Sequence, residues 1–240
     1  PARSRPMRPS SSRPIRRGDG RYLQGVEAPE GRRYAALFLF APGKVAIDSR
    51  RAYRYGALAA TIHASTDRQS KRHPRFHLDL KHLLEDPLAG MAVQLQHRRH
   101  DLDYLHGVAT GLAAKIRELL PTTTPEYGVC HGDLHHGNVH FGDDDEMTIF
   151  VLRLLGVRLA YDISVFYWNY CHEVGEKKAK AVWSAYRKGY REVRPYSRAE
   201  LAAVNYFVPI CHIWLVGLHA GLSQDYGRGW MQDGYFDRQI

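Results

Sequence analysis

The sequence predicts an α+β fold in which a mostly helical body holds one small β-hairpin and is preceded by a pair of strands. Apolar residues recur with a helical period over residues 49–66, 101–119, 182–190 and 201–218. Short β-like runs at residues 139–141 and 147–151 flank a polar turn. The 240 residues are 44% hydrophobic and 25% charged. This composition is typical of a globular protein and excludes disorder of the whole chain.

Residues 1–20 are predicted to form a basic, disordered tail. Six of the 34 Lys and Arg residues lie in residues 1–17, which contain no acidic residue. Basic and acidic residues are nearly balanced in the rest of the chain. Because a nucleic-acid-binding protein needs a basic face on its folded part, we expect no nucleic-acid partner. The segment also lacks the apolar core of a secretory signal.

Residues 21–43 read as two short strands, 22–26 and 34–40, joined by a Pro-Glu-Gly turn and stopped by Pro42-Gly43. Residues 44–240 then form the helical body. We find no stretch that approaches the roughly 18–20 apolar residues of a membrane span. The three cysteines favour a reducing compartment, so we expect a cytoplasmic protein.

The segment that carries chemistry is residues 130–138, which read C-H-G-D-L-H-H-G-N. Asp133 precedes Asn138 by five residues in a glycine-punctuated loop that leads into a strand. A carboxylate placed this way can accept a proton from a hydroxyl group, and a nearby amide oxygen can hold a divalent cation. Phosphoryl transfer needs both functions, because its catalysis rests on positioning and charge neutralisation.

Simpler interpretations exist for these residues. Asp133 is also typical of a turn, and Asp162 can cap the helix that starts at Ile163. The nearby histidines suggest zinc but lack the closed ligand set of a zinc site. Residues 143–145 lack the Gly and Glu spacing of a calcium loop.

The H-G-D-L-H-H-G-N motif resembles the catalytic loop of the aminoglycoside phosphotransferase and choline kinase family, whose pattern is roughly H-G-D-x-x-x-x-N. APEGRRYAALFLFAPGK resembles the family's strand into the hinge between lobes, and GVRLAYDISVFYW the segment after its metal-binding strand. HIWLVGLH and GRGWMQDGYFDRQ resemble the C-terminal helices, most closely those of stress-response kinase A and homoserine-kinase-like members. The resemblance covers about residues 20–240 and implies a protein-kinase-like fold: a helical C-lobe and a remnant of the N-lobe sheet.

The resemblance also implies roles for individual residues. Asp133 would be the catalytic base, His131 would hold the loop in shape, and Asn138 would bind Mg²⁺. Asp162 would be a buried carboxylate that braces the loop backbone.

The resemblance implies transfer of the ATP γ-phosphate to a hydroxyl of a small molecule or of a protein Ser or Thr. ATP and Mg²⁺ would be the cofactors. Backbone groups at Leu39, Phe40 and Ala41 would contact the adenine.

Two departures from the family pattern predict an impaired protein. The family's metal-binding Asp aligns with Val151, whose side chain cannot bind Mg²⁺, and Arg153 adds positive charge nearby. The first lysine is Lys44, after the hinge, so the phosphate-binding half of the small lobe is expected to be missing. We therefore expect very weak MgATP binding, and the alternative function is a catalytically inactive, pseudokinase-like binding module. Apolar surface near Leu37 and Leu39 predicts self-association.

Overall fold

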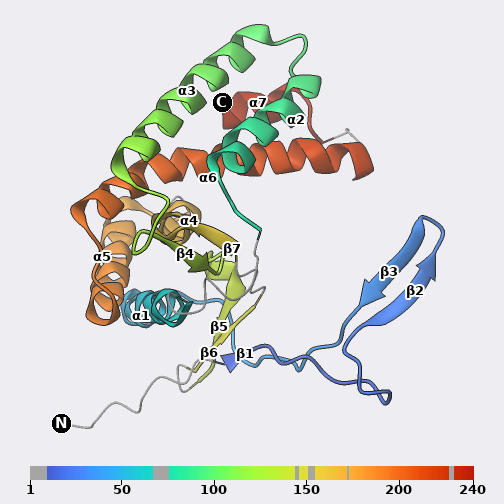
Figure 1. The fold of residues 1–240 in the computed structure, drawn as a ribbon, viewed down its shortest axis with the longest axis vertical. Coiled ribbons are helices and arrows are strands. Elements are labelled where there is room, and N and C mark those ends of the chain that lie inside the picture. The colour runs from blue at the N-terminus through green and yellow to red at the C-terminus, as the bar shows by residue number, and fades with distance from the viewer. Residues whose placement is uncertain (1–9, 67–75, 144–145, 151–154, 172, 227–229) are drawn as a thin grey trace.

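The structure is a computed structural model of the chain and describes residues 10–66, 76–143, 146–150, 155–171, 173–226 and 230–240. Its helices are α1 (Ser49–Thr66), α2 (Asp86–Gln94), α3 (Arg99–Leu119), α4 (Leu159–Cys171), α5 (Glu176–Val193), α6 (Arg198–Tyr226) and α7 (Asp233–Gln239), with a π-helical turn η1 (Lys81–Glu85) and a 3₁₀ turn η2 (His136–Asn138). Figure 1 shows α2, α3, α6 and α7 gathered at one end of the body and α1, α4 and α5 at the other.

The strands form three small sheets. They are β1 (Ser10–Ser11), β2 (Gln24–Ala28), β3 (Gly31–Ala35), β4 (Tyr127–Cys130), β5 (Val139–Phe141), β6 (Met147–Ile149) and β7 (Leu155–Arg158). β5 and β6 form the predicted hairpin, with His140 opposite Thr148. β4 pairs antiparallel with β7, and β2 with β3. The predicted α+β class, with a helical body around one small hairpin, is confirmed.

Two clusters of buried side chains meet along α4. Tyr161 and Val165 belong to the cluster shared with α2, α3 and α6. Ile163 and Phe166 belong to the cluster shared with α1, α5 and the β5–β6 hairpin. Because α4 is buried on both faces, it fixes the two ends of the body relative to each other. The loop that precedes β5 therefore sits on a rigid support.

Helices α1 and α5 pack unusually closely, and two glycines allow it. A Cβ atom on Gly189 would lie 1.8 Å from the backbone oxygen of Tyr53, and one on Gly56 would lie 2.0 Å from the backbone oxygen of Tyr186. Real side chains never approach a backbone oxygen this closely. The contact between the two helices therefore requires glycine at both positions.

Helix α6 is longer and more apolar than the sequence analysis anticipated. Its segment Arg198–Ser223 has a mean hydropathy of 1.7, enough by length and composition for a membrane span. In the structure, 44% of that window is buried, and α6 packs against α2, α3 and α4. These contacts are those of a core helix.

The β2–β3 hairpin and its flanks form an arm, residues 12–40, that projects away from the helices (Figure 1). None of these residues is buried. The strands begin and end elsewhere than predicted, at 24–28 and 31–35 instead of 22–26 and 34–40. With no buried face to set the register, the local turn sets it: Ala28 pairs with Gly31, whose φ of +116° suits glycine.

A disordered tail is predicted over residues 1–20, but residues 10–15 make ordered backbone hydrogen bonds in the structure. β1 pairs parallel with β6, and the Ser12 N–H donates to the Ile149 carbonyl at 3.2 Å. The Ile15 N–H donates to the Leu37 carbonyl at 2.8 Å. The Ile149 carbonyl lies on the edge of β6, which offers a partner to an extended segment. A composition-based prediction has no access to such edges.

Candidate active site

Asp162 anchors the loop that follows β4. It lies in the first turn of α4 and is fully buried. Its Oδ2 accepts a hydrogen bond from the His131 backbone N–H at 2.8 Å, and its Oδ1 accepts one from the Gly132 N–H at 2.8 Å. A buried carboxylate that accepts two backbone donors holds them far more firmly than water would. The loop backbone is thus fixed directly before Asp133.

Two residues that the sequence analysis missed complete this support. His63 on α1 is fully buried, and its Nε2 lies 3.2 Å from Asp162 Oδ2. Its Nδ1 lies 2.8 Å from the Tyr190 hydroxyl on α5. Burial raises the pKa of Tyr190 well above its ordinary value, so the phenol keeps its proton and donates to Nδ1. His63 Nε2 then donates to the carboxylate.

This network also explains why three residues of types that often bind metal ions lie close together. Single ligand atoms of His63, Cys130 and Asp162 lie within 4.8 Å of one another, and all three residues are buried. The two His63 nitrogens and both Asp162 oxygens already have hydrogen-bond partners. We therefore interpret the cluster as a satisfied polar network that supports the loop.

His131 holds the loop from the inside. Its buried ring accepts the Asp133 N–H at Nδ1, at 3.3 Å, and lies 2.9 Å from the Phe150 carbonyl through Nε2. Because Nδ1 is an acceptor, the proton sits on Nε2, which donates to Phe150. One ring thus connects the loop to the end of the β5–β6 hairpin.

The side chains of Asp133 and Asn138 converge, as the motif predicts. Asn138 Nδ2 donates to the Asp133 carboxylate at 3.1 Å and to the Asp133 backbone carbonyl at 2.8 Å. Both bonds use the amide nitrogen. The amide oxygen, which is the atom that can bind a divalent cation, takes part in neither.

The backbone of this loop is shaped by a glycine directly before Asp133 and supported by a phenol from α1. Gly132 has a φ of +84°, and a Cβ atom there would lie 2.8 Å from the Leu155 side chain. The Tyr55 hydroxyl donates to the His135 carbonyl at 3.1 Å. Burial raises the pKa of Tyr55 well above its ordinary value, and the carboxylates of Asp162 and Asp133 raise it further.

His135 lies beside the candidate base. Its Nε2 is 3.8 Å from Asp133 Oδ1, and its Nδ1 accepts the Gly137 N–H at 3.0 Å. Burial lowers the pKa of His135, and the Asp133 carboxylate opposes that change only in part. The lowered pKa favours the uncharged form of the ring at neutral pH.

The predicted adenine-contacting residues line a hollow of about 230 Å³. Leu39, Phe40 and Ala41 share it with Ser12, Arg13, Pro42 and Thr148. The Leu39 N–H donates to the Arg13 carbonyl at 2.9 Å, and the Ala41 carbonyl lies 3.3 Å from His140 Nδ1. Because Thr148 is on β6, the hollow lies against the hairpin that follows the loop.

A larger hollow, of about 560 Å³, lies between α4 and α6. Trp168, Asn169 and Glu173 line one side, and Val208, Pro209, His212 and Leu215 line the other. Glu173 Oε2 is 3.5 Å from Nε2 of His136, which belongs to the loop. Among the described residues, Asn169 Oδ1 and His136 Nδ1 are buried without a hydrogen-bond partner. The walls are thus largely apolar, with unsatisfied polar atoms on the side toward the loop.

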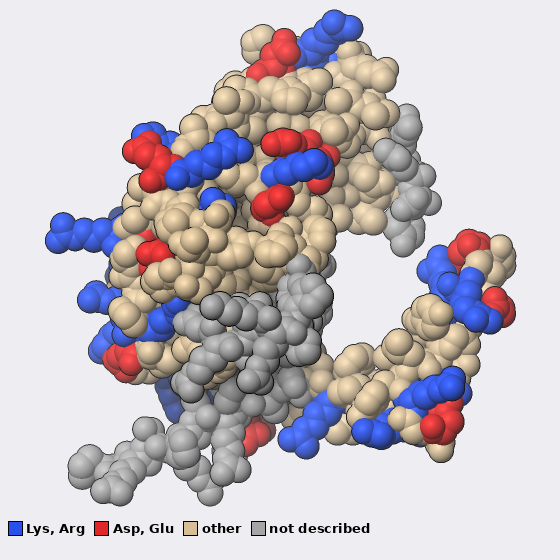
Figure 2. Space-filling model, in the orientation of Figure 1, with Lys and Arg blue, Asp and Glu red and all other residues tan. Residues whose placement is uncertain are grey.

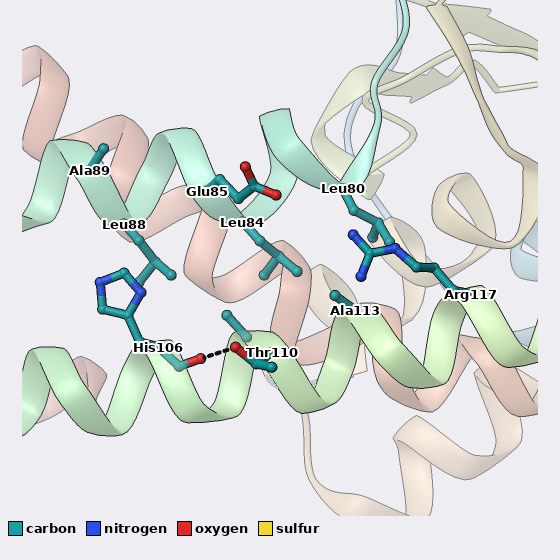
Figure 3. A pocket seen from close by; sticks show the side chains of 10 residues that line it. Leu80, Leu84, Glu85, Leu88, Ala89, His106, Thr110, Ala113 and Arg117 are labelled. Carbon is teal, nitrogen blue, oxygen red and sulfur yellow. Dashed lines mark hydrogen bonds between the residues drawn. The ribbon is translucent and has the colours of Figure 1, made fainter.

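A third hollow, of about 260 Å³, lies between η1–α2 and α3 (Figure 3). Leu80, Leu84 and Leu88 point across it toward α3, and the Thr110 hydroxyl donates to the His106 carbonyl at 2.8 Å. None of its lining residues comes from the loop or the hinge. Its position gives it no part in the chemistry of Asp133.

The predicted degenerate metal position, Val151, lies outside the described residues, as does Arg153. The loss of a metal ligand there therefore stays a prediction from the sequence. Among the other predicted site residues, the structure brings His131, Asp133, Asn138 and Asp162 together.

Comparisons with known proteins identify relatives of the chain. Residues 5–196 match the model of the phosphotransferase enzyme family. Two relatives are an uncharacterised protein of Deinococcus radiodurans, 33% identical over 219 residues, and the Synechocystis protein sll1119, 31% identical over 233 residues. These alignments cover 90% and 95% of this chain but 63% of each relative, so the chain spans less than two thirds of their length.

Solved structures show the same fold. The amicoumacin kinase hAmiN, solved with AMP-PNP, Ca²⁺ and Ami, has a TM-score of 0.69 and 21% identity over 89% of this chain and 66% of its own. A microcompartment-associated aminopropanol kinase has a TM-score of 0.69 and 17% identity, over 88% and 68%. At these identities the similarity shows a shared kinase-like architecture.

Proposed function

Because the chain belongs to the phosphotransferase enzyme family, we propose that its site transfers the γ-phosphoryl group of ATP to a hydroxyl group of a small molecule. The observation that carries this proposal is the pairing of the Asp133 and Asn138 side chains on a loop that Asp162 holds by two backbone hydrogen bonds. Phosphoryl transfer depends on the positioning of charged groups more than on covalent chemistry by the protein.

In this proposal Asp133 accepts the proton of the acceptor hydroxyl. The Asn138 amide, which donates to the carboxylate at 3.1 Å, keeps it in place. Asn138 would hold a divalent cation through its amide oxygen, and Mg²⁺ would supply charge neutralisation at the phosphates. The donor chemistry of Asn138 fits, because an amide oxygen is a hard oxygen ligand of the kind that Mg²⁺ prefers.

We assign the adenine to the hollow lined by Leu39, Phe40 and Ala41. It lies against β6, whose hairpin begins directly after Asn138. A nucleotide seated there extends its phosphates toward the loop. Support also comes from hAmiN, which was solved with AMP-PNP and Ca²⁺.

We assign the acceptor to the hollow between α4 and α6. Its volume of about 560 Å³ suits a small molecule better than a protein segment. Glu173 and the Trp168 ring together favour an ammonium group, which pairs with a carboxylate and stacks on an aromatic face. An amino alcohol fits both the hollow and the hydroxyl chemistry, and the neighbour named as an aminopropanol kinase acts on such a compound.

A catalytically inactive binding module is the second candidate, and Val151 favours it. The family that the sequence resembles carries a metal-binding Asp at the position of Val151, so one Mg²⁺ ligand would be missing here. Arg153 adds positive charge close by in the sequence. In that case MgATP would bind weaker than millimolar and no better than adenosine, because the triphosphate would gain little. The chain has three cysteines, of which Cys130 and Cys211 are buried, and this sparse content suits the proposed cytoplasmic location.

Calorimetry with adenosine, ATP and MgATP, together with a phosphate-release assay on amino alcohols, tests both candidates. Phosphotransfer predicts turnover that Asp133→Asn lowers by at least about a hundred-fold, the scale expected for loss of a general base. Asp19→Asn, on the arm, is the matched control and should leave turnover unchanged. Absence of turnover, with adenosine and MgATP binding equally, would overturn phosphotransfer and support the binding module.

A further inference from the structure

A groove of about 620 Å³ separates the second half of α5 from the start of α6. Four cationic side chains line it: Arg187, Lys188, Arg191 and Arg198. Figure 2 shows Lys and Arg side chains projecting along the edge of the molecule where α5 lies in Figure 1. None of the lining residues belongs to the catalytic loop, the hinge or the hollow between α4 and α6.

The spacing of the cations concentrates their charge. Arg187 and Arg191 are four residues apart on α5 and therefore lie on one face of the helix. Like charges at this spacing repel each other and destabilise the helix unless something neutralises them. Within the described part of the chain, no ion pair joins any of the four cations to a carboxylate.

Aromatic rings hold two of these guanidinium groups in place without neutralising them. The Arg187 guanidinium lies 5.3 Å from the centroid of the Trp183 ring, and that of Arg191 lies 5.8 Å from the centroid of Tyr196. The Nε atom of Arg187 is buried and has no hydrogen-bond partner among the described residues. The groups are thus oriented in advance for a ligand.

The two nearest acidic residues are engaged elsewhere. Glu192 lines the groove, but its carboxylate accepts the hydroxyl of Tyr53 on α1. Glu200 is buried and accepts the Ser197 N–H at 2.7 Å as part of the cap of α6. Four cations thus line the groove against one lining carboxylate, that of Glu192. The groove therefore keeps a net positive charge.

We propose that this groove binds a small, multiply charged oxyanion of the phosphate type. Arginine presents planar, paired donors that match phosphate oxygens, and three of the four cations are arginines. The N-terminus of α6, at Arg198, adds backbone N–H donors at the positive end of a 29-residue helix. The volume suits an oligophosphate or a phosphorylated metabolite.

The test is calorimetric titration of the full chain with tripolyphosphate and with orthophosphate at constant ionic strength. Tripolyphosphate should bind more tightly, because it carries more charge. In the double variant Arg187→Gln, Arg191→Gln its affinity should fall by about a hundred-fold, since each charge-assisted hydrogen bond contributes about ten-fold. The variant Lys188→Gln, Arg198→Gln alters exposed residues only and should also lose affinity, whether or not the first variant folds.

The matched control is Lys177→Gln, Lys178→Gln, which removes the same charge from the exposed first turn of α5. It should change the affinity by less than about two-fold, the effect of long-range charge alone. The Arg187→Gln, Arg191→Gln variant also separates the groove from the proposed nucleotide site, because neither arginine lines that site. Equal losses in control and groove variants, or unchanged binding in all of them, would overturn the proposal. Tighter binding of a short DNA duplex with the same dependence on the groove arginines would overturn it in favour of a nucleic-acid surface.

Discussion

The loop between β4 and β5 and the β2–β3 arm are held in opposite ways. The loop backbone donates to Asp162, which is buried and in turn contacts His63 on another helix. The arm relies on its own ladder and on exposed pairs such as Arg32 with Glu27, at 2.6 Å. Hydrogen bonds to a charged group in a protein are worth about 1.5–3 kcal/mol, whereas exposed ion pairs contribute about 0–1 kcal/mol. Rigid positioning is therefore concentrated at the loop.

The largest expected effect comes from removing the anchor. Asp162→Ala should lower the free energy of unfolding by about 3–5 kcal/mol, because it leaves two buried N–H donors and His63 without their acceptor. Urea denaturation measures the change. Asp19→Ala removes an exposed pair with Arg17 on the arm and should cost less than about 1 kcal/mol. Equal costs for the two variants would mean that burial does not separate loop from arm.

A smaller effect is expected where α1 meets α5, the helices that carry His63 and Tyr190. Gly189→Ala should destabilise the protein by about 1–3 kcal/mol, because the new methyl group would overlap the Tyr53 carbonyl. The same substitution at Gly107, on α3, meets no atom within 4 Å and should stabilise by about 0.5–1 kcal/mol. Thermal unfolding of the Gly189→Ala and Gly107→Ala variants measures whether the two changes in stability have opposite signs. Destabilisation by both substitutions would contradict the packing argument.

The smallest effect on stability is expected in the arm. Leu37 is 73% exposed and Phe40 is 88% exposed, so replacing both with Ser should change the free energy of unfolding by less than about 0.5 kcal/mol. We propose that these side chains instead drive self-association. Light scattering over a range of concentrations should then show less association in the double variant. A monodisperse monomer in the parent chain would remove the basis for that proposal.

Sequence patterns predicted best where local signals decide the structure. The helix over residues 49–66 has the predicted bounds, and the convergence of Asp133 with Asn138 follows from a five-residue loop. The β4–β7 pair was missed, because its strands are short and nearly thirty residues apart in the chain. The roles of His63 and Tyr190 were missed for the same reason. A lone histidine on an apolar helical face gives no sign of a partner 127 residues away.

The anchoring of the loop by Asp162 also has a consequence for solvent exchange. Amide hydrogens exchange with deuterium only when their hydrogen bonds open, and buried ones open with the surrounding structure. The amides of His131 and Gly132 are bonded to a fully buried carboxylate, so they should exchange only when α4 separates from the loop. The exchange rates of these two protons therefore report whether the loop between β4 and β5 is intact, in the native protein and without any ligand or substrate.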